Sequence, residues 1–298
     1  MKAIQALSKD FFKENTHPIT LRSIHGDQHH QHSGDLTDVE HWHDFAELVI
    51  ITEGYGIHSI DGIDYPVSAG DVFVFQGKTK HYFKERHGLA MHNIMYDNRR
   101  LQPFLRNLQG NAGYNAMFLL EPAYRRRHRF KSRLRISRRS LAHVETIIHR
   151  IRDEQEQQLA GNDTIMLSML LELIVFFSRQ YSKVDIPQAK TLYRIGKIIG
   201  RLETQYQKNW NITQLTKVAG MSKSSLIVAF KNATGYSPID YLIRIRLQKA
   251  AELLIETEYS LGEISMQCGF HDSNYLTRQF HRVYNITPIK FRKNNQYN

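Results

Sequence analysis

The sequence predicts an α+β protein with two main domains. The first is an N-terminal β-barrel of the jelly-roll type that carries a helical hairpin, and the second is an all-α domain with two helix-turn-helix units. Three observations predict this fold class: short apolar runs alternate with turn residues, two long apolar helical patterns follow, and one helix–glycine–helix pattern then occurs twice. The expected boundaries are a polar N-terminal segment at 1–40, the barrel at 41–136, the helical pair at 137–181, a linker at 182–188 and the all-α domain at 189–298.

Strands of the barrel are expected between His41 and Tyr96. Apolar runs at 48–52, 72–75 and 91–96 have the length and composition of buried strands. The dipeptide Asp61-Gly62 is a signal for a two-residue hairpin turn. Many short strands joined by such turns are typical of a barrel or jelly roll.

Three histidines and one glutamate stand out within these strands. His41, His43 and Glu47 lie at positions that strand alternation places on one face, and His81 follows on a later strand. These four side chains could coordinate a divalent metal, hydrogen-bond a polyhydroxylated ligand inside an apolar cup, or bond only to one another and to the backbone. Of the three interpretations we favour the binding of a small ligand.

The spacing His41-x-His43-x3-Glu47-x6-Gly54 resembles the first motif of the cupins, in which such residues point into the barrel and often bind a metal. The second cupin motif is not matched. Ser68 stands where proline is usual, and His81 comes eleven residues after Gly70 instead of close behind it. The resemblance therefore supports a cupin-like barrel more than a cupin enzyme.

Two helices are expected after the barrel, at 140–158 and 163–181. In the first, Val144, Ile147, Ile148 and Ile151 recur at helical spacing. The second is apolar on most of its surface, which implies burial against the barrel and against its partner helix. A contact with a second subunit and a role in packing alone are equal alternatives for one of the two helices. The run at 165–177 is too short to span a membrane and contains Glu172, so we expect a soluble, intracellular protein with no membrane partner.

The repeated pattern lies between residues 212 and 291. In each copy a glycine, Gly220 or Gly269, ends a short helix, and a capping residue, Ser222 or Asp272, begins the next one. The turn of the second copy is one residue longer, and in both copies a serine or threonine followed by proline begins a further helix. A helical hairpin explains either copy alone, but two copies predict a pair of helix-turn-helix units.

Charge is distributed unevenly along the 298 residues, whose net charge is +11. Residues 188–298 hold 16 Lys or Arg against 7 Asp or Glu, whereas residues 1–187 hold 24 against 22. The basic C-terminal part favours a polyanionic partner. The stretch 125–139 contains nine Lys or Arg and no acidic residue, and we interpret it as a solvated loop and strand in preference to a nucleic-acid arm. Cys268 is the single cysteine, so no internal disulfide forms.

The segment from Ala189 to Arg292 resembles the DNA-binding domain of the AraC/XylS family of bacterial transcription regulators. The resemblance is carried by short motifs in both copies: Ala219-Gly220-Met221-Ser222, Thr234-Gly235-Tyr236-Ser237-Pro238, Gly269-Phe270-x2-Ser273-Asn274-Tyr275-Leu276, Phe280 and Thr287-Pro288-x2-Phe291-Arg292. It implies seven helices, two helix-turn-helix units joined by a central helix, and double-stranded DNA as the partner. It further implies cytoplasmic activation of transcription with RNA polymerase, by a homodimer.

The resemblance also implies which residues contact DNA, from the third and sixth helices of the domain. In the first copy these positions are Lys223, Ser224, Ile227, Val228 and Lys231, and in the second they are Ser273, Asn274, Thr277 and Arg278. Asn274 can pair with adenine and Arg278 with guanine, whereas Ile227 and Val228 can only touch a thymine methyl group. We therefore expect the second unit to perform most of the hydrogen-bonded base recognition.

The barrel resembles the sensor domains of the family members that respond to L-rhamnose. The matching residues are His41-x-His43-Asp44-Phe45-x-Glu47-Leu48-Val49-Ile50, Ala69-Gly70-Asp71-Val72-Phe73, Lys80-His81 and Asn93-Ile94-Met95-Tyr96. A sugar-like effector, with L-rhamnose as the first choice, is the expected ligand of His41, His43, Glu47 and His81. We expect no catalytic residue and no cofactor. The alternatives are a divalent metal on the same four residues, as in a cupin isomerase or dioxygenase with a DNA-binding tail, and a regulator of the same fold with a non-sugar effector.

Overall fold

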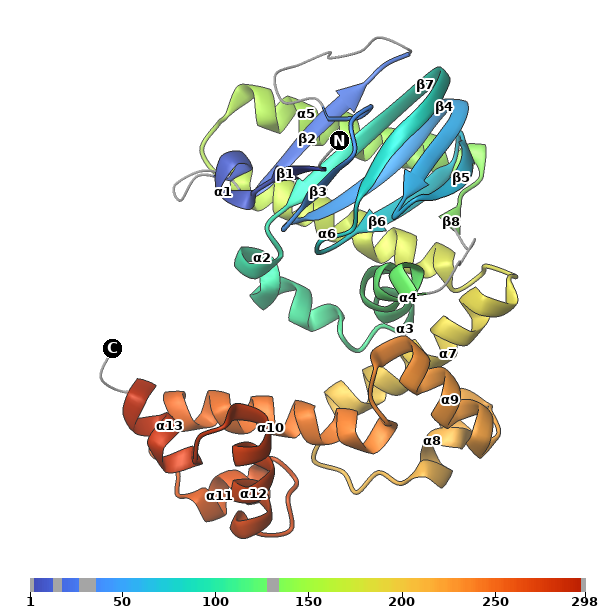
Figure 1. Cartoon of the computed structure of the whole chain (residues 1–298). Helices are drawn as coiled ribbons and strands as arrows, with labels where there is room; N and C mark the ends of the chain where they lie inside the picture. Colours follow the sequence, from blue (N-terminus) through green and yellow to red (C-terminus); the bar gives the residue numbers. More distant parts are fainter. Residues whose placement is uncertain (1–2, 13–17, 27–35, 128–133, 296–298) are drawn as a thin grey trace. The chain divides into compact units, whose positions relative to one another are not determined.

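The computed structural model describes residues 3–12, 18–26, 36–127 and 134–295 of the chain (Figure 1). The chain divides into two compact units. The first comprises residues 1–108 and 113–193, and the second comprises residues 109–112 and 194–298. The division at residue 193 falls inside a helix, and the last two residues of the expected linker 182–188 also belong to that helix, because Pro187 begins it.

The first unit is built on one mixed sheet with the order β1-β3-β7-β4-β6-β8, to which β2 adds at β7 and β5 adds at β4. Its strands are β1 (Ile4–Ala6), β2 (Ile19–Ile24), β3 (His41–His43), β4 (Ala46–Ile60), β5 (Ile63–Ser68), β6 (Asp71–Phe75), β7 (His81–Tyr96) and β8 (Leu134–Arg135). The two longest strands, β4 and β7, pair antiparallel from Ala46↔Tyr96 to Ile60↔His81. An apolar cluster that includes Val49, Phe73 and Met91 forms its core. The cupin-like sheet domain predicted from the sequence is thereby confirmed.

The polar segment 1–40 contributes two strands that the sequence did not predict. β2 pairs antiparallel with β7, and Ile19, Leu21 and Ile24 are buried on it. β1 pairs in parallel with β3. These strands are short and lie among polar residues, so their alternation is too weak a signal to recognise before their pairing partners are known. Four histidines, His25, His29, His30 and His32, lie in the same polar segment. Residues 27–35 are outside the described part of the chain.

Helices occupy much of the first unit, including most of residues 98–127 that the sequence assigned to the barrel. They are α1 (Ser8–Phe11), α2 (Asn98–Leu105), the 3-10 turn η1 (Arg106–Leu108), α3 (Ala112–Tyr114), the π-helical segment η2 (Asn115–Leu120), α4 (Glu121–Arg127), α5 (Arg138–Gln157) and α6 (Asn162–Tyr181). The predicted helical pair is confirmed as α5 and α6, which pack on each other beside the sheet (Figure 1). Among the described residues α6 alone has the length and apolar composition of a membrane span, and its buried face lies in this core.

Two arginines of the basic stretch 125–139 form ion pairs inside the first unit. Arg125 of α4 is buried, lies 2.7 Å from a carboxylate oxygen of Glu121 and faces the rings of Phe73 and Phe75. Arg135 binds Asp71 at 2.8 Å. The expected solvated loop is therefore wrong at Arg125, which is buried in α4, whereas the expected strand is confirmed as β8. Residues 128–133 are outside the described ranges.

A polar contact joins α5 to the sheet and predicts a pH dependence. Arg152 of α5 donates to Ser23 Oγ at 3.0 Å, and Ser23 Oγ lies 2.8 Å from His92 Nδ1. Burial, together with Arg152 and the nearby His25 and His149, lowers the pKa of His92 to about 4. The fold thus favours neutral His92, and the unfolded chain binds the proton more tightly.

We expect the first unit to keep this stabilisation above about pH 6.5 and to lose on the order of 2–3 kcal/mol as the pH falls from 7 to 4. Thermal unfolding measured across this range would test it. His92→Gln should make the pH dependence shallower, with buried His41 and His58 supplying the rest, whereas His87→Gln, at an exposed position of the same strand, should leave it unchanged. An identical slope in His92→Gln would contradict the assignment.

The second unit contains the helices of the repeated pattern. They are α7 (Pro187–Thr204, which begins in the first unit), α8 (Ile212–Ala219), α9 (Lys223–Thr234), α10 (Pro238–Glu256), α11 (Leu261–Gln267), α12 (Ser273–Tyr284) and α13 (Pro288–Asn295). The predicted caps are confirmed. Gly220 ends α8 in the left-handed conformation with φ 61°, Ser222 Oγ accepts from Ser225 N at 3.2 Å, and Asp272 accepts from Tyr275 N at 2.6 Å.

Candidate functional site

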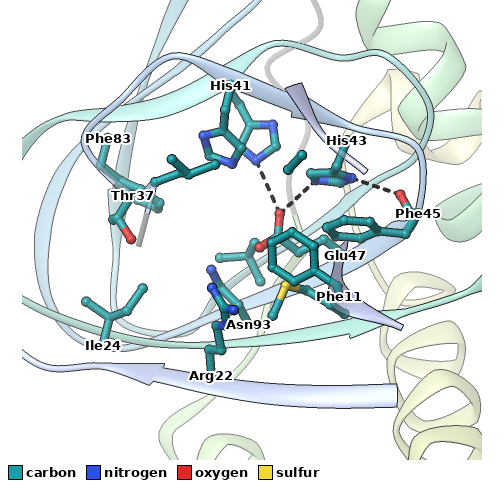
Figure 2. Close-up of a pocket in the computed structure, with 15 residues that line it drawn as sticks. Phe11, Arg22, Ile24, Thr37, His41, His43, Phe45, Glu47, Phe83 and Asn93 are labelled. Atoms are coloured by element: carbon teal, nitrogen blue, oxygen red, sulfur yellow. Dashed lines mark hydrogen bonds and ion pairs between the residues drawn. The ribbon is translucent and has the colours of Figure 1, made fainter. Parts of the chain in front are cut away.

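The pocket of interest lies inside the curled sheet of the first unit (Figure 2). Its lining comes from β1–β4, β7, α1 and the segment before β3: Ala6, Phe11, Arg22, Ile24, Leu36, Thr37, His41, His43, Phe45, Glu47, Val49, His81, Phe83, Asn93 and Met95. Eight of the fifteen lining residues are apolar, and the other seven bring polar groups to the same pocket. Apolar walls with convergent polar groups suit a small ligand.

All four residues that the sequence singled out line this pocket. His41 and His43 alternate on β3, Glu47 follows on β4, and the pairing of β3 with β7 places His81 directly beside His41. The exposed fraction of each of the four is below a tenth. Glu47 Oε2 lies 3.1 Å from His43 Nε2 and 3.2 Å from His81 Nε2, so one carboxylate holds two imidazoles.

The other ring nitrogen of each histidine faces a backbone carbonyl. His41 Nδ1 lies 2.8 Å from Val39 O, His43 Nδ1 lies 2.9 Å from Phe45 O, and His81 Nδ1 lies 3.2 Å from Thr79 O. A carbonyl only accepts hydrogen bonds, so each Nδ1 must carry the proton. In a neutral imidazole the Nε2 atom is then left with a lone pair.

This proton count defines what the cluster can hold. Two neutral imidazoles would aim Nε2 lone pairs at an ionised carboxylate, which also only accepts. The conflict is relieved if His43 and His81 are both protonated, or if a cation or a ligand hydroxyl group lies among the three side chains. Burial alone raises the pKa of Glu47, but the hydrogen bonds from His43 and His81 outweigh it and hold that pKa well below its usual value.

A divalent metal fits the same donor set. The ligand atoms of His43, Glu47 and His81 all lie within 4.8 Å of one another. Tetrahedral zinc with Zn–N bonds near 2.0–2.1 Å separates its donors by about 3.4 Å, and the two His–Glu separations are close to that value. The Nδ1–H bonds to backbone carbonyls are the outer contacts that commonly orient metal-bound histidines.

Three polar groups near the pocket were missed from the sequence. Arg22 of β2 extends toward the pocket from the side opposite the imidazoles, and Asn93 of β7 lies near it (Figure 2). Asn93 Oδ1 is buried and accepts no hydrogen bond from any described residue. His58 of β4 is fully buried behind His81, stacks on Phe83 and makes no hydrogen bond within the described part of the chain. Alternation on β2, where Arg22 and Ile24 share a face, was the one signal that could have revealed Arg22.

Burial sets the charge state of the outer histidines. It lowers the pKa of His41 to about 4, with His81 adding to the effect, and it holds the pKa of His58 well below its usual value. Both rings are therefore neutral at physiological pH. His41 can accept a hydrogen bond at Nε2, which suits a ligand hydroxyl group.

A second candidate site is formed by the exposed faces of α9 and α12. On α9, Lys223, Ser224 and Lys231 are exposed, 59% of the surface of Val228 is accessible, and Ile227 is half-buried. The buried side of the helix consists of Leu226, Phe230 and Ala233. Neither α9 nor α12 contains an acidic residue, so both faces suit a polyanion.

On α12 the two predicted base-reading side chains are exposed. Asn274 and Arg278 are one turn apart, and the guanidinium of Arg278 lies 5.9 Å from the ring of Tyr275. Ser273 and Thr277 are half-buried, and Thr277 Oγ1 donates to Ser273 O at 2.7 Å. Since its hydroxyl proton is used within the helix, Thr277 is available mainly as an acceptor and as a methyl contact.

Comparison with known proteins assigns a domain family to each part of the chain. A profile of the AraC-like ligand binding domain matches residues 27–168, and a profile of a helix-turn-helix domain matches residues 215–294. The chain belongs to the AraC family of transcription regulators.

Relatives of this AraC-family regulator include two activators of similar length. The transcriptional activator RhaR of Pectobacterium carotovorum subsp. carotovorum (strain PC1) is 28% identical over 260 residues, which are 85% of each chain. The transcriptional activator RhaS of Escherichia coli O1:K1 / APEC is 26% identical over 254 residues, 85% of this chain and 87% of that protein. Among solved structures, the C-terminal domain of the response regulator yesN from Fusobacterium nucleatum subsp. nucleatum ATCC 25586 is 34% identical with a TM-score of 0.31, covering 32% of this chain and 93% of that one.

The AraC-family regulator is thus a DNA-binding transcription activator with a ligand-binding domain. Its ligand-binding domain contains the His–Glu pocket, and its helix-turn-helix domain contains α9 and α12.

Proposed function

We propose that this activator responds to a small polyhydroxylated effector, with L-rhamnose as the first candidate, bound in the pocket of His41, His43, Glu47 and His81. The observation that carries the proposal is the pocket itself, because its apolar walls surround an excess of acceptors. Asn93 Oδ1 is buried without a donor among the described residues, and His41 and Glu47 present further acceptors. Sugar hydroxyl groups are donors that satisfy such a set.

Thermal unfolding with a panel of sugars tests this proposal. An effector that binds only the folded chain raises its stability by RT ln(1 + [L]/Kd), which is about 2.7 kcal/mol at one hundred times Kd. L-rhamnose should raise the melting temperature of the first unit, and stereoisomers such as L-fucose should raise it less. If no sugar in the panel has an effect, the effector belongs to another chemical class.

A metal ion in the same cluster is the second candidate, favoured by the proton count at His43, Glu47 and His81. These residues would hold the ion, which would offer a Lewis-acidic position for a ligand oxygen. Elemental analysis of protein purified without chelators would distinguish the candidates. Close to one equivalent of a transition metal, lost in His43→Ala, would favour the metal, whereas a metal-free protein that binds a sugar would favour the first proposal.

DNA recognition is proposed to divide between the two helix-turn-helix units. α12 supplies hydrogen bonds to base edges through Asn274 and Arg278, with Ser273 and Thr277 beside them, and α9 supplies apolar contacts through Ile227 and Val228 beside Ser224. Lys223 and Lys231 lie at exposed positions suited to phosphates. Footprinting of the full chain on its own upstream DNA, with and without sugars, would locate the contacted segments. If footprinting at low salt shows no protected segment, the proposal is contradicted.

The apolar face of α9 predicts sensitivity to thymine methyl groups. Replacing thymine by uracil in the segment contacted by α9 removes a methyl group, whose burial contributes about 0.8 kcal/mol to the free energy of binding. Affinity should therefore fall about fourfold for each contacted base. Fluorescence anisotropy with paired duplexes measures this loss. Val228→Ala should abolish part of the difference between the two duplexes, and the same replacement in the segment read by α12 serves as the control. Equal binding of both duplexes would exclude a methyl contact.

A homodimer is proposed to form through α5 and α6. A partly apolar groove lies there on the surface of the first unit, lined by His143, Ser168, Leu171, Glu172, Val175, Phe176 and Arg179. Sedimentation of the full chain should show a dimer that Val175→Glu dissociates. A wild-type monomer at micromolar concentration would exclude this dimer.

Activation is further proposed to act in the cytoplasm through RNA polymerase. Transcription in vitro with purified RNA polymerase and this chain would test that proposal.

A further inference from the structure

The loop between α7 and α8, residues 205–210, is held in one shape by its own hydrogen bonds. Lys208 N donates to Gln205 O at 3.1 Å, and Trp210 donates through its backbone N to Lys208 O at 2.8 Å and through Nε1 to Gln205 O at 3.0 Å. Lys208 Nζ lies 4.6 Å from the centre of the Trp210 ring. Asn211, which caps α8, follows directly, so the position of this loop determines where the first helix-turn-helix unit begins.

Arg246 of α10 connects this loop to the central helix. Its side chain is directed inward, with an exposed fraction of 8%, and donates through Nε to Tyr206 O at 2.8 Å and through Nη2 to Lys208 O at 3.0 Å. The guanidinium also lies 5.8 Å from the ring of Phe270, which is in the turn of the second helix-turn-helix unit. A buried guanidinium needs acceptors that do not move, and the two loop carbonyls provide them.

The same loop touches the turn of the second helix-turn-helix unit. Gln207 Nε2 donates to Gln267 O at 2.8 Å, at the end of α11. A Cβ atom on Gly269 would lie 2.7 Å from Gln207 Cα and from Gln207 O, which is closer than any side chain tolerates. Gly269 also has φ +77°, so both the close approach and the backbone conformation require glycine.

The two helix-turn-helix units are therefore joined by two connections instead of one. The first is α10, whose N-terminal half packs Tyr241 on Phe230 of α9 and whose C-terminal half lies in the core with Leu276 of α12. The second is the loop 205–210, which leads into α8 and contacts the turn before α12. A single helix can bend, but a helix and a loop that connect the same two bodies resist bending.

We propose that the loop 205–210 acts as a brace that fixes the spacing of α9 and α12, and that Arg246 is the positioning residue that holds it. This rests on the proposed use of both helices to read DNA. One base pair moves a contacted segment by about 3.4 Å and turns it by about 35° around the duplex axis, so a braced pair of helices tolerates only one spacing. Loss of the brace lowers affinity for that spacing and relaxes the choice between spacings.

The test uses duplexes that the wild-type full chain selects from a random pool. Each is compared with a version that carries one base pair inserted between the two footprinted segments. The insertion should weaken wild-type binding at least about tenfold, comparable to losing one good base contact. In Arg246→Met, which keeps the volume but removes the donors, the insertion penalty should fall below about threefold. Arg244→Met is the matched control, because Arg244 is exposed on the same helix and stacks on Tyr236.

Gln207→Ala provides a milder variant that leaves the core intact and should lower the insertion penalty in the same direction. A folded Arg246→Met chain with the wild-type penalty would overturn the proposal and assign the spacing to α10 alone. A wild-type chain that binds both duplexes equally would overturn it as well. If none of the selected duplexes shows two protected segments, the proposed reading of DNA by both α9 and α12 is overturned, and the brace proposal falls with it.

Discussion

Replacing Glu47 with glutamine is expected to weaken effector binding at least about tenfold and to destabilise the first unit by about 3 kcal/mol. Glu47 Oε2 lies 3.1 Å from His43 Nε2 and 3.2 Å from His81 Nε2, and all three side chains are buried. Glutamine has the same shape but no charge, and its NH2 group donates where the carboxylate accepted. The variant therefore loses the negative charge that the site offers to a protonated imidazole, a cation or a ligand hydroxyl group.

Calorimetric titration with the effector found in the thermal panel measures the first effect, and denaturant unfolding measures the second. Glu53→Gln is the matched control, since Glu53 lies on the same strand at an exposed position. It should bind and unfold like the wild type. If Glu47→Gln binds the effector with wild-type affinity, the His–Glu cluster serves packing alone, which was the third interpretation of these residues in the sequence.

Arg278→Ala is expected to lower the preference for specific over random DNA by about 5- to 150-fold. Arg278 is exposed on α12 one turn beyond Asn274, where its fork of donors can bind the O6 and N7 atoms of guanine. Alanine keeps the helix and its buried face of Leu276 and Phe280. The loss should therefore appear in recognition and leave stability almost unchanged.

Anisotropy titrations of selected and scrambled duplexes at fixed salt measure this ratio. Arg282→Ala, one turn further along the same exposed face, is the comparison. A phosphate contact at that position should weaken binding to both duplexes alike and reduce the salt slope by about one. If Arg278→Ala shows the same uniform loss, Arg278 binds phosphate and the guanine contact is excluded.

Local signals predicted the helical half of the chain well. Gly220, Ser222, Asp272 and Pro238 act on their own and adjacent turns, and each lies in the capping position that its chemistry predicts. The paired copies of this short pattern were enough to recognise two helix-turn-helix units. The same reasoning placed His41, His43 and Glu47 on one face of a pair of strands.

The sequence by itself determined the caps, the apolar periodicity and the alternation along strands, because these depend on residues within about four positions of one another. Only the tertiary structure decided that β2 of the polar segment adds to β7 and that His81 lies beside Glu47. It alone also decided that Arg22 and Asn93 border the same pocket, and that Arg246 reaches the loop before α8. Each of these contacts joins residues separated by 34 to 77 positions. Such contacts depend on which strands and helices become neighbours, and no short-range pattern specifies that choice.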